Sequence, residues 1–98
     1  MQQAARNSTT QAVAYTGTAA ASTNAFGAQT RQIRIVANSA CHYVIAGTPV
    51  AVTTDPFLPA SWVEYVTVNP GEKISAIKAA TNGLVTTTDG TLWVTELT

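Results

Sequence analysis

Cys41 and His42 are the single cysteine and the single histidine of the chain, and they are neighbours. A thiol beside an imidazole could act as a nucleophile and its base, provided that the two side chains face each other and a third group orients the base. Adjacent residues of a β-strand point to opposite faces of the sheet. We therefore expect a buried thiol and an imidazole at the surface or rim, and no Cys–His catalytic pair within one chain.

The other groups that could hold a metal or transfer a proton are scattered along the sequence. One cysteine and one histidine fall short of the four ligands of a structural zinc site. The five carboxylates are well separated: Asp55, Glu64, Glu72, Asp89 and Glu96. Neither a calcium-binding loop nor a glycine-rich phosphate loop is present. The sequence therefore predicts no catalytic residue, no metal and no cofactor, and we expect that the protein is not an enzyme.

The seven aromatic residues could bind a partner in a protein that has no catalytic function. Trp and Tyr are common anchors in protein interfaces, they can also form a platform for sugars, and a small core must use some of them for packing. Three of them are candidates for an interface: Trp62, Tyr65 and Trp93. From the residues alone, core packing, a protein interface and carbohydrate binding all stay open.

The elements that must position these residues are β-strands. The chain has 98 residues, the size of a single domain. Val, Ile, Thr and the aromatic residues dominate, whereas Leu, Lys and Glu, the usual helix formers, are few. Charged residues make up only 10% and the net charge is +0, so nothing favours binding to nucleic acid or to an anionic membrane. No apolar run approaches the length of a membrane span.

Residues 31–98 read as short strands separated by turns, a spacing typical of a β-sandwich or a small barrel, and of the two we expect a single small β-sandwich. Asn69-Pro70-Gly71-Glu72 has the pattern of a type II turn, and Asn82-Gly83 is a hairpin signal. An irregular step at Ala76-Ile77 suggests a bulge. The expected strands cover 32–37, 41–46, 50–53, 62–68, 73–79, 84–87 and 91–97.

Residues 1–30 differ from the rest in composition and predict an extended N-terminal arm. This segment carries one charge, Arg6, and few large apolar residues, so it cannot bury enough surface to order on its own. We expect its first ten residues to be mobile. Its sizeable side chains, Val13, Tyr15 and Phe26, are then the candidate contacts with a partner or a neighbouring subunit.

The segments IRIVANSACHYVIAG, TPVAVTTD, PFLPA, EYVTVNPGEKISAI and GTLWVTEL resemble a type of small bacteriophage virion protein. The resemblance covers about residues 31–98 and none of these segments is catalytic. It implies a capsid decoration (cement) or minor head protein, with a jelly-roll-like sandwich that is often a homotrimer. Such a protein is made in the host cytoplasm, binds the major capsid protein on the surface of the phage head, and stabilises the assembled shell.

The low charge and the small core independently favour self-association. A monomer with few surface charges is poorly protected against association, and an oligomer can bury its exposed strand edges. The alternative to a capsid protein is a tail- or fibre-associated sandwich that binds host glycan through surface aromatics. Exposed, coplanar aromatic rings and a fluorescence response to sugars would indicate glycan binding. Aromatic residues in subunit contacts would indicate a capsid protein.

Overall fold

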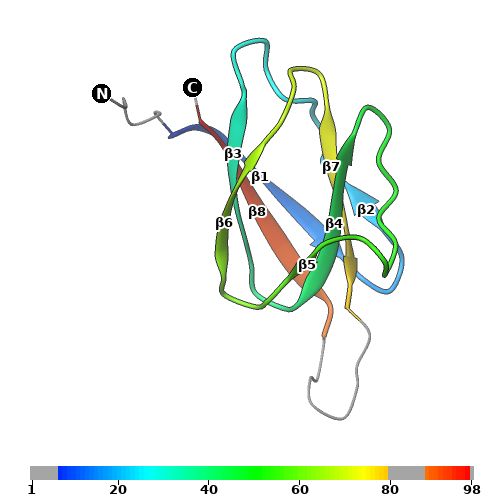
Figure 1. Ribbon diagram of the computed structural model, residues 1–98. Helices are drawn as coiled ribbons and strands as arrows, with labels where there is room; N and C mark the ends of the chain where they lie inside the picture. Colours follow the sequence, from blue (N-terminus) through cyan, green and yellow to red (C-terminus); the bar gives the residue numbers. More distant parts are fainter. Residues whose placement is uncertain (1–6, 80–87, 98) are drawn as a thin grey trace.

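The computed structural model describes residues 7–79 and 88–97, and within them the chain forms strands and no helix. The strands make two four-stranded antiparallel sheets, as expected for an all-β protein (Figure 1). Sheet A has the order β1 (Asn7–Tyr15), β8 (Gly90–Leu97), β3 (Gln32–Ala37) and β6 (Val63–Thr67). Sheet B has the order β2 (Ala20–Ala21), β7 (Lys73–Lys78), β4 (Cys41–Ala46) and β5 (Phe57–Leu58).

The pairing of the strands is nested. The first strand pairs with the last, β2 with β7, β3 with β6, and β4 with β5. The contacts between β3 and β8 and between β4 and β7 then join these pairs into the two sheets. Strands that are distant in the sequence therefore lie side by side, and β1 and β8 bring the two ends of the described chain together.

The core lies between the sheets and is built from the inward-facing half of each strand. In sheet A, Ile33 and Ile35 alternate with more exposed residues along β3, and in sheet B, Ile74 and Ala76 are fully buried on β7. Burying one side chain the size of isoleucine stabilises a fold by about 1.5–3 kcal/mol. Two-residue alternation thus places the apolar positions of both sheets in one shared cluster.

The N-terminal segment is part of this core, so the prediction of an extended arm is wrong for residues 7–30. β1 pairs with β8 along its length, and Val13, Tyr15 and Phe26 are at most 3% exposed within their own chain. The small residues Ala12 and Ala14 of β1 face outward, so the composition of the segment looks too poor in apolar residues to fold. Residues 1–6, where mobility was also expected, lie outside the described part of the chain.

Hydrogen bonds fix the loop between β2 and β3 to both sheets. The Ser22 N–H donates to the Ile74 carbonyl and the Phe26 N–H to the Glu72 carbonyl, both at 2.8 Å. The buried carboxylate of Glu96 accepts a hydrogen bond from the Gly27 N–H at 2.9 Å and another from the Thr30 hydroxyl. This loop therefore closes one side of the core.

The turn predicted at residues 69–72 is present. Gly71 has φ of 86°, which a type II turn requires at its third residue, and the Glu72 N–H donates to the Asn69 carbonyl at 3.3 Å. The expected strand at 50–53 is absent, and the short strand β5 forms at 57–58 instead. β7 pairs with β4 in unbroken register, so there is no bulge at Ala76-Ile77. The hairpin at 82–83 and the strand at 84–87 lie outside the described residues.

Candidate functional site

The outer face of sheet A carries a continuous line of apolar side chains across all four strands. Val63 pairs with Val36, Val36 pairs with Trp93, and Trp93 pairs with Ala12. Residues directly opposite in an antiparallel sheet project on the same face, so these four side chains are neighbours. We call them the apolar row. Trp93 is 40% exposed, a large fraction for an indole in a regular strand.

A second, more polar row runs beside the apolar row on the same face. It consists of Tyr65, Arg34, Thr95 and Thr10, which pair in that order across the sheet. Tyr65 is 60% exposed, and the Thr10 and Thr95 hydroxyls lie 3.0 Å apart. Arg34 is the single charged residue of the two rows. The face is therefore apolar and aromatic, with one cation within it.

Trp62 adds a third exposed aromatic residue just before β6. Ser61 has φ of 61°, a left-handed conformation that side chains other than glycine seldom adopt, and its N–H donates to the Ala37 carbonyl at 2.7 Å. The hydrogen bond from Ser61 fixes the backbone directly before Trp62. The Trp62 side chain is 59% exposed. The structure thus exposes all three aromatic residues chosen from the sequence, and it places Tyr65 and Trp93 on one face, on strands separated by β3.

The outer face of sheet B is different, because residues 47–56 fold over it. The Ala51 N–H donates to the Ser75 hydroxyl at 3.0 Å, and both residues are almost completely buried. Val50 and Val52 are exposed on this covering loop rather than on a strand. Within the described residues, sheet A therefore has the open face.

Cys41 and His42 lie as the strand alternation predicts. Cys41 is fully buried as a free thiol, and burial raises its pKa to about 11. The His42 ring is half-buried on the other side of β4, where Nδ1 lies 2.8 Å from the Asp55 carbonyl oxygen and the ring contacts Phe57 edge-on. The thiol stays protonated near neutral pH and has no imidazole facing it, so these two residues do not form a nucleophile–base pair.

Two buried tyrosines connect the sheets. The Tyr15 hydroxyl donates to the Ser39 carbonyl, and the Tyr43 hydroxyl donates to the Glu64 carboxylate at 2.7 Å. Burial raises the pKa of both phenols, and the nearby carboxylate of Glu64 raises that of Tyr43 further. Both phenols therefore act as neutral hydrogen-bond donors that hold the structure together. Sequence analysis missed this role, although Tyr15 at two-residue spacing from Val13 was a signal for it.

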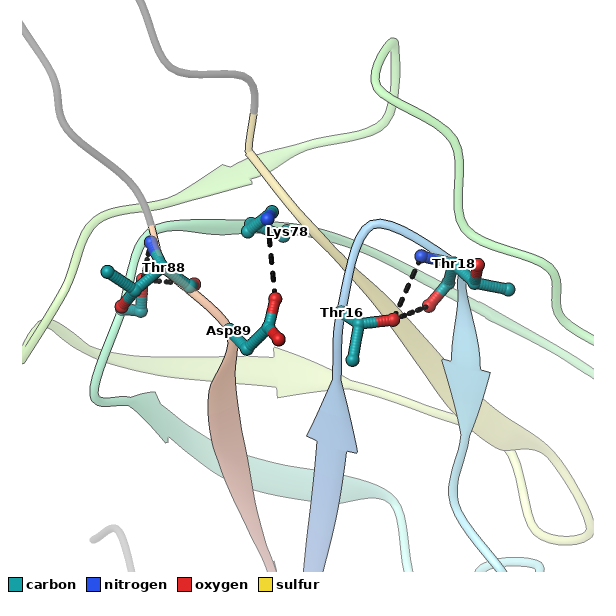
Figure 2. A network of polar contacts seen from close by, with 6 residues as sticks. Thr16, Thr18, Lys78, Thr88 and Asp89 are labelled. Atoms are coloured by element: carbon teal, nitrogen blue, oxygen red, sulfur yellow. Dashed lines mark hydrogen bonds and ion pairs between the residues drawn. The ribbon is translucent and has the colours of Figure 1, made fainter.

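Figure 2 shows a polar cluster at the end of the molecule where β7 ends and β8 begins. Lys78 Nζ lies 3.3 Å from the Asp89 carboxylate, and both side chains are substantially exposed. Thr16 and Thr18 form a local turn nearby, in which the Thr18 N–H donates to the Thr16 hydroxyl at 3.1 Å. An exposed ion pair of this kind contributes about 0–1 kcal/mol. The cluster therefore joins the end of β7 to the start of β8 by an exposed contact and has no arrangement for chemistry.

Residues 7–79 and 88–97 contain no group of three or more His, Cys, Asp or Glu side chains placed to hold a metal ion. They also contain no helix long and apolar enough to cross a membrane.

No protein-family model, curated protein or solved structure matches this chain. The resemblance to phage virion proteins therefore stays a prediction. Among the described residues, the open face of sheet A is the feature from which a function can be inferred.

Proposed function

We propose that this protein is a non-catalytic structural protein of a virion, which decorates the assembled head shell by binding it with the outer face of sheet A. The observation that carries the proposal is the exposure of Trp93 and Tyr65 on the outer face of sheet A, the open sheet face among the described residues. Large aromatic side chains left in solvent on a flat sheet gain free energy when a partner covers them, and they are typical centres of protein interfaces.

The surroundings of the aromatic residues favour a protein partner over a sugar. Trp93 has Ala12 and Val36 as its cross-strand neighbours, and neither can donate or accept a side-chain hydrogen bond. A sugar site needs polar side chains beside the ring to bind hydroxyl groups, and on this face those side chains stand in the neighbouring row with Tyr65 and not opposite Trp93. Arg34 within an otherwise uncharged face instead fits a protein surface that offers a carbonyl or a carboxylate at the centre of the contact.

The strand pairing supports the finer expectation of a jelly roll. Pairing of β1 with β8, β2 with β7, β3 with β6 and β4 with β5 is the pattern produced when a long four-stranded ribbon folds over on itself. Jelly rolls occur in viral capsid proteins and also in lectins, so the fold alone does not select between shell and glycan. The apolar row of the face supports the choice of a shell over a glycan.

A decoration protein would stabilise the shell if it binds only the assembled state. A protein that binds neighbouring capsid subunits in a shell, and not the free subunits, shifts the equilibrium toward the shell by linkage. Many weak contacts on a symmetric lattice then act together. A face with an apolar row and a single charge is suited to this role because its affinity comes from buried area, without a ligand or a covalent step.

The test is co-sedimentation with shells assembled from the major capsid protein that is encoded together with this chain. Trp93→Ala and Tyr65→Ala should each weaken binding about tenfold or more, as expected for aromatic anchors of an interface. Phe57→Ala is the matched control, because Phe57 is 44% exposed but belongs to sheet B. It should bind like the original protein, and thermal melts should show that all three variants fold.

Two outcomes would contradict the proposal. Equal binding by all variants would show that the face of sheet A is not the attachment surface. Quenching of tryptophan fluorescence by host-surface glycans, lost in Trp93→Ala and kept in Phe57→Ala, would identify the glycan-binding alternative.

A further inference from the structure

The four edges of the two sheets differ in how well they are protected against pairing with another chain. β2 and β5 have two residues each, and short edge strands are poor templates. β6 has five residues, and Glu64 directs its carboxylate inward toward Tyr43, an arrangement that discourages an added strand. β1 has nine residues, of which none is charged and none is proline. Its pairing with β8 is irregular between Asn7 and Thr10 and regular from Thr10 to Tyr15, so the regular edge is the second part of the strand. β1 is therefore the long edge without these protections.

The free side of β1 can be identified from the hydrogen-bond pattern of sheet A. The Asn38 N–H donates to the Thr91 carbonyl, so Thr91, Trp93 and Thr95 bond toward β3. The alternate residues of β8, Gly90, Leu92 and Val94, then bond toward β1, where their partners are Tyr15, Val13 and Gln11. In an antiparallel sheet, the residues that alternate with these along β1 direct their N–H and C=O groups to the other side of the strand, away from β8. These residues are Thr10, Ala12 and Ala14, and all three are exposed.

We propose that a second copy of this chain pairs with this edge, β1 against β1 in antiparallel orientation, about a two-fold axis at Ala12. Ala12 then faces Ala12 of the second copy, and Thr10 faces Ala14 at both ends. About six interchain hydrogen bonds form, two for each hydrogen-bonded pair. The contact is isologous, and it uses on each copy the three residues whose backbone groups are directed away from β8.

The register at Ala12 is selected by the apolar row. Val63, Val36, Trp93 and Ala12 are successive partners across sheet A, and Ala12 is the last of them at the free edge. A two-fold axis at this position continues the row into the second copy, so that one apolar line crosses both sheets. The side chains at the seam are alanine and threonine, which allow the backbones to approach. The net charge of +0 gives two copies no overall repulsion.

This inference does not depend on the identity of the shell or glycan partner. It assigns a dimer, whereas the resemblance to decoration proteins implies a trimer. The two can be separated by mass, since a dimer has twice the 10.2 kDa of one chain.

Sedimentation velocity of the full chain at micromolar concentration should show a dimer. Ala12→Lys places like charges opposite each other at the two-fold axis, and it should raise the dimer dissociation constant at least tenfold. Ala28→Lys, which adds the same charge in the exposed loop before β3, is the matched control and should leave the dimer intact. A monomer or a trimer for the original protein, or equal behaviour of the two lysine variants, would overturn the proposal.

Disulfide trapping tests the register directly. In a Cys41→Ala background, Ala12→Cys brings two thiols to opposite positions, with Cα atoms about 5.5 Å apart and thus within the range of a disulfide. Ala14→Cys lies on the same strand and the same face, but its copies are about four residues or 13 Å apart along the strands. Mild oxidation should therefore cross-link the first variant and not the second. Equal cross-linking of both, or of neither, would overturn the assigned register.

Discussion

Gly90 shows how closely single residues are fitted where β8 begins. A Cβ atom at this position would lie 2.6 Å from the Tyr15 hydroxyl oxygen and 2.6 Å from Asn38 Oδ1. Both oxygens are held in place, because the Tyr15 hydroxyl donates to the Ser39 carbonyl and Asn38 Oδ1 accepts from the Thr91 N–H. Neither can move without losing a hydrogen bond, so this position requires glycine for space.

Gly90→Ala should therefore lower the free energy of unfolding by about 2–3 kcal/mol, through overpacking and the loss of a buried hydrogen bond. The measurement is urea denaturation followed by tryptophan fluorescence. Gly47→Ala is the matched control, since a Cβ at Gly47 meets nothing within 4 Å. A Gly90→Ala protein as stable as the Gly47→Ala protein would contradict the packing described for Tyr15.

Three buried acids with raised pKa values make stability sensitive to alkaline pH. Cys41, Tyr15 and Tyr43 stay protonated in the folded protein at a pH where they ionise in the unfolded chain. The unfolded state then binds fewer protons, so stability falls as pH rises. We expect a nearly constant melting temperature around neutral pH and a decline that begins near pH 9, the ordinary pKa of a thiol.

Thermal melts from neutral pH to pH 11 check this expectation. Cys41→Ala removes the part of the decline that belongs to the thiol, whose pKa rises from 9.0 to about 11 on burial. That part is on the order of 2 kcal/mol. A melting temperature that does not fall between pH 9 and pH 11 would show that these groups are not buried as described.

At the scale of elements, the strand β1 determines whether the sheets can form. Without it, β8 loses one of its two neighbours, and Leu92 and Val94 lose their cross-strand partners Val13 and Gln11. Gln11 also exchanges two hydrogen bonds of 3.0 Å with the backbone of Asn24, which ties the β2–β3 loop to β1. β1 therefore supports both a sheet and a loop.

A protein that starts at Thr30 should consequently lack a cooperative unfolding transition, because it has lost Val13, Tyr15 and Phe26 from the core. Circular dichroism during heating is the measurement. A chain that starts at Asn7 is the control, and it should melt cooperatively because every described strand remains. Cooperative melting of the shorter chain would restore the interpretation of this segment as a separable arm.

The strands that sequence analysis could predict are those with large apolar residues at every second position, such as Gln32–Ala37 and Cys41–Ala46. In β1 the alternation from Gln11 to Thr16 is weak and indicates a strand only if another surface receives it. The outward residues are Thr10, Ala12 and Ala14 and the inward set includes Gln11, so the total apolar content is low as well. The candidate aromatics could be chosen from residue type alone. Their shared face could not, because it depends on the registers of β8 on β3 and of β3 on β6.

On the scale of the whole molecule, the distribution of charge sets how the protein can bind. The net charge is +0, and the open face of sheet A presents one cation among apolar and hydroxyl side chains. Neither long-range attraction nor repulsion is available to such a surface. Contact with a partner must then be stabilised by buried apolar area.

Binding to shells should therefore change little between low and high salt, because screening weakens exposed charge pairs and leaves apolar contacts intact. Co-sedimentation at several salt concentrations measures this. Arg34→Gln keeps much of the side-chain volume and should remove whatever small salt dependence is present. Release of the protein from shells by moderate salt would point to an electrostatic contact elsewhere on its surface.

The nested pairing of strands also implies an order of folding. β4 and β5 are close in sequence and can pair first, after which β3 meets β6 and β2 meets β7 across loops that the inner pairs have already shortened. β1 and β8 join last, because they close the longest loop. β1 therefore becomes an ordered edge strand only after β8 has paired with it. We therefore expect that a chain still being synthesised lacks this edge, and that the proposed pairing of two copies follows the folding of each.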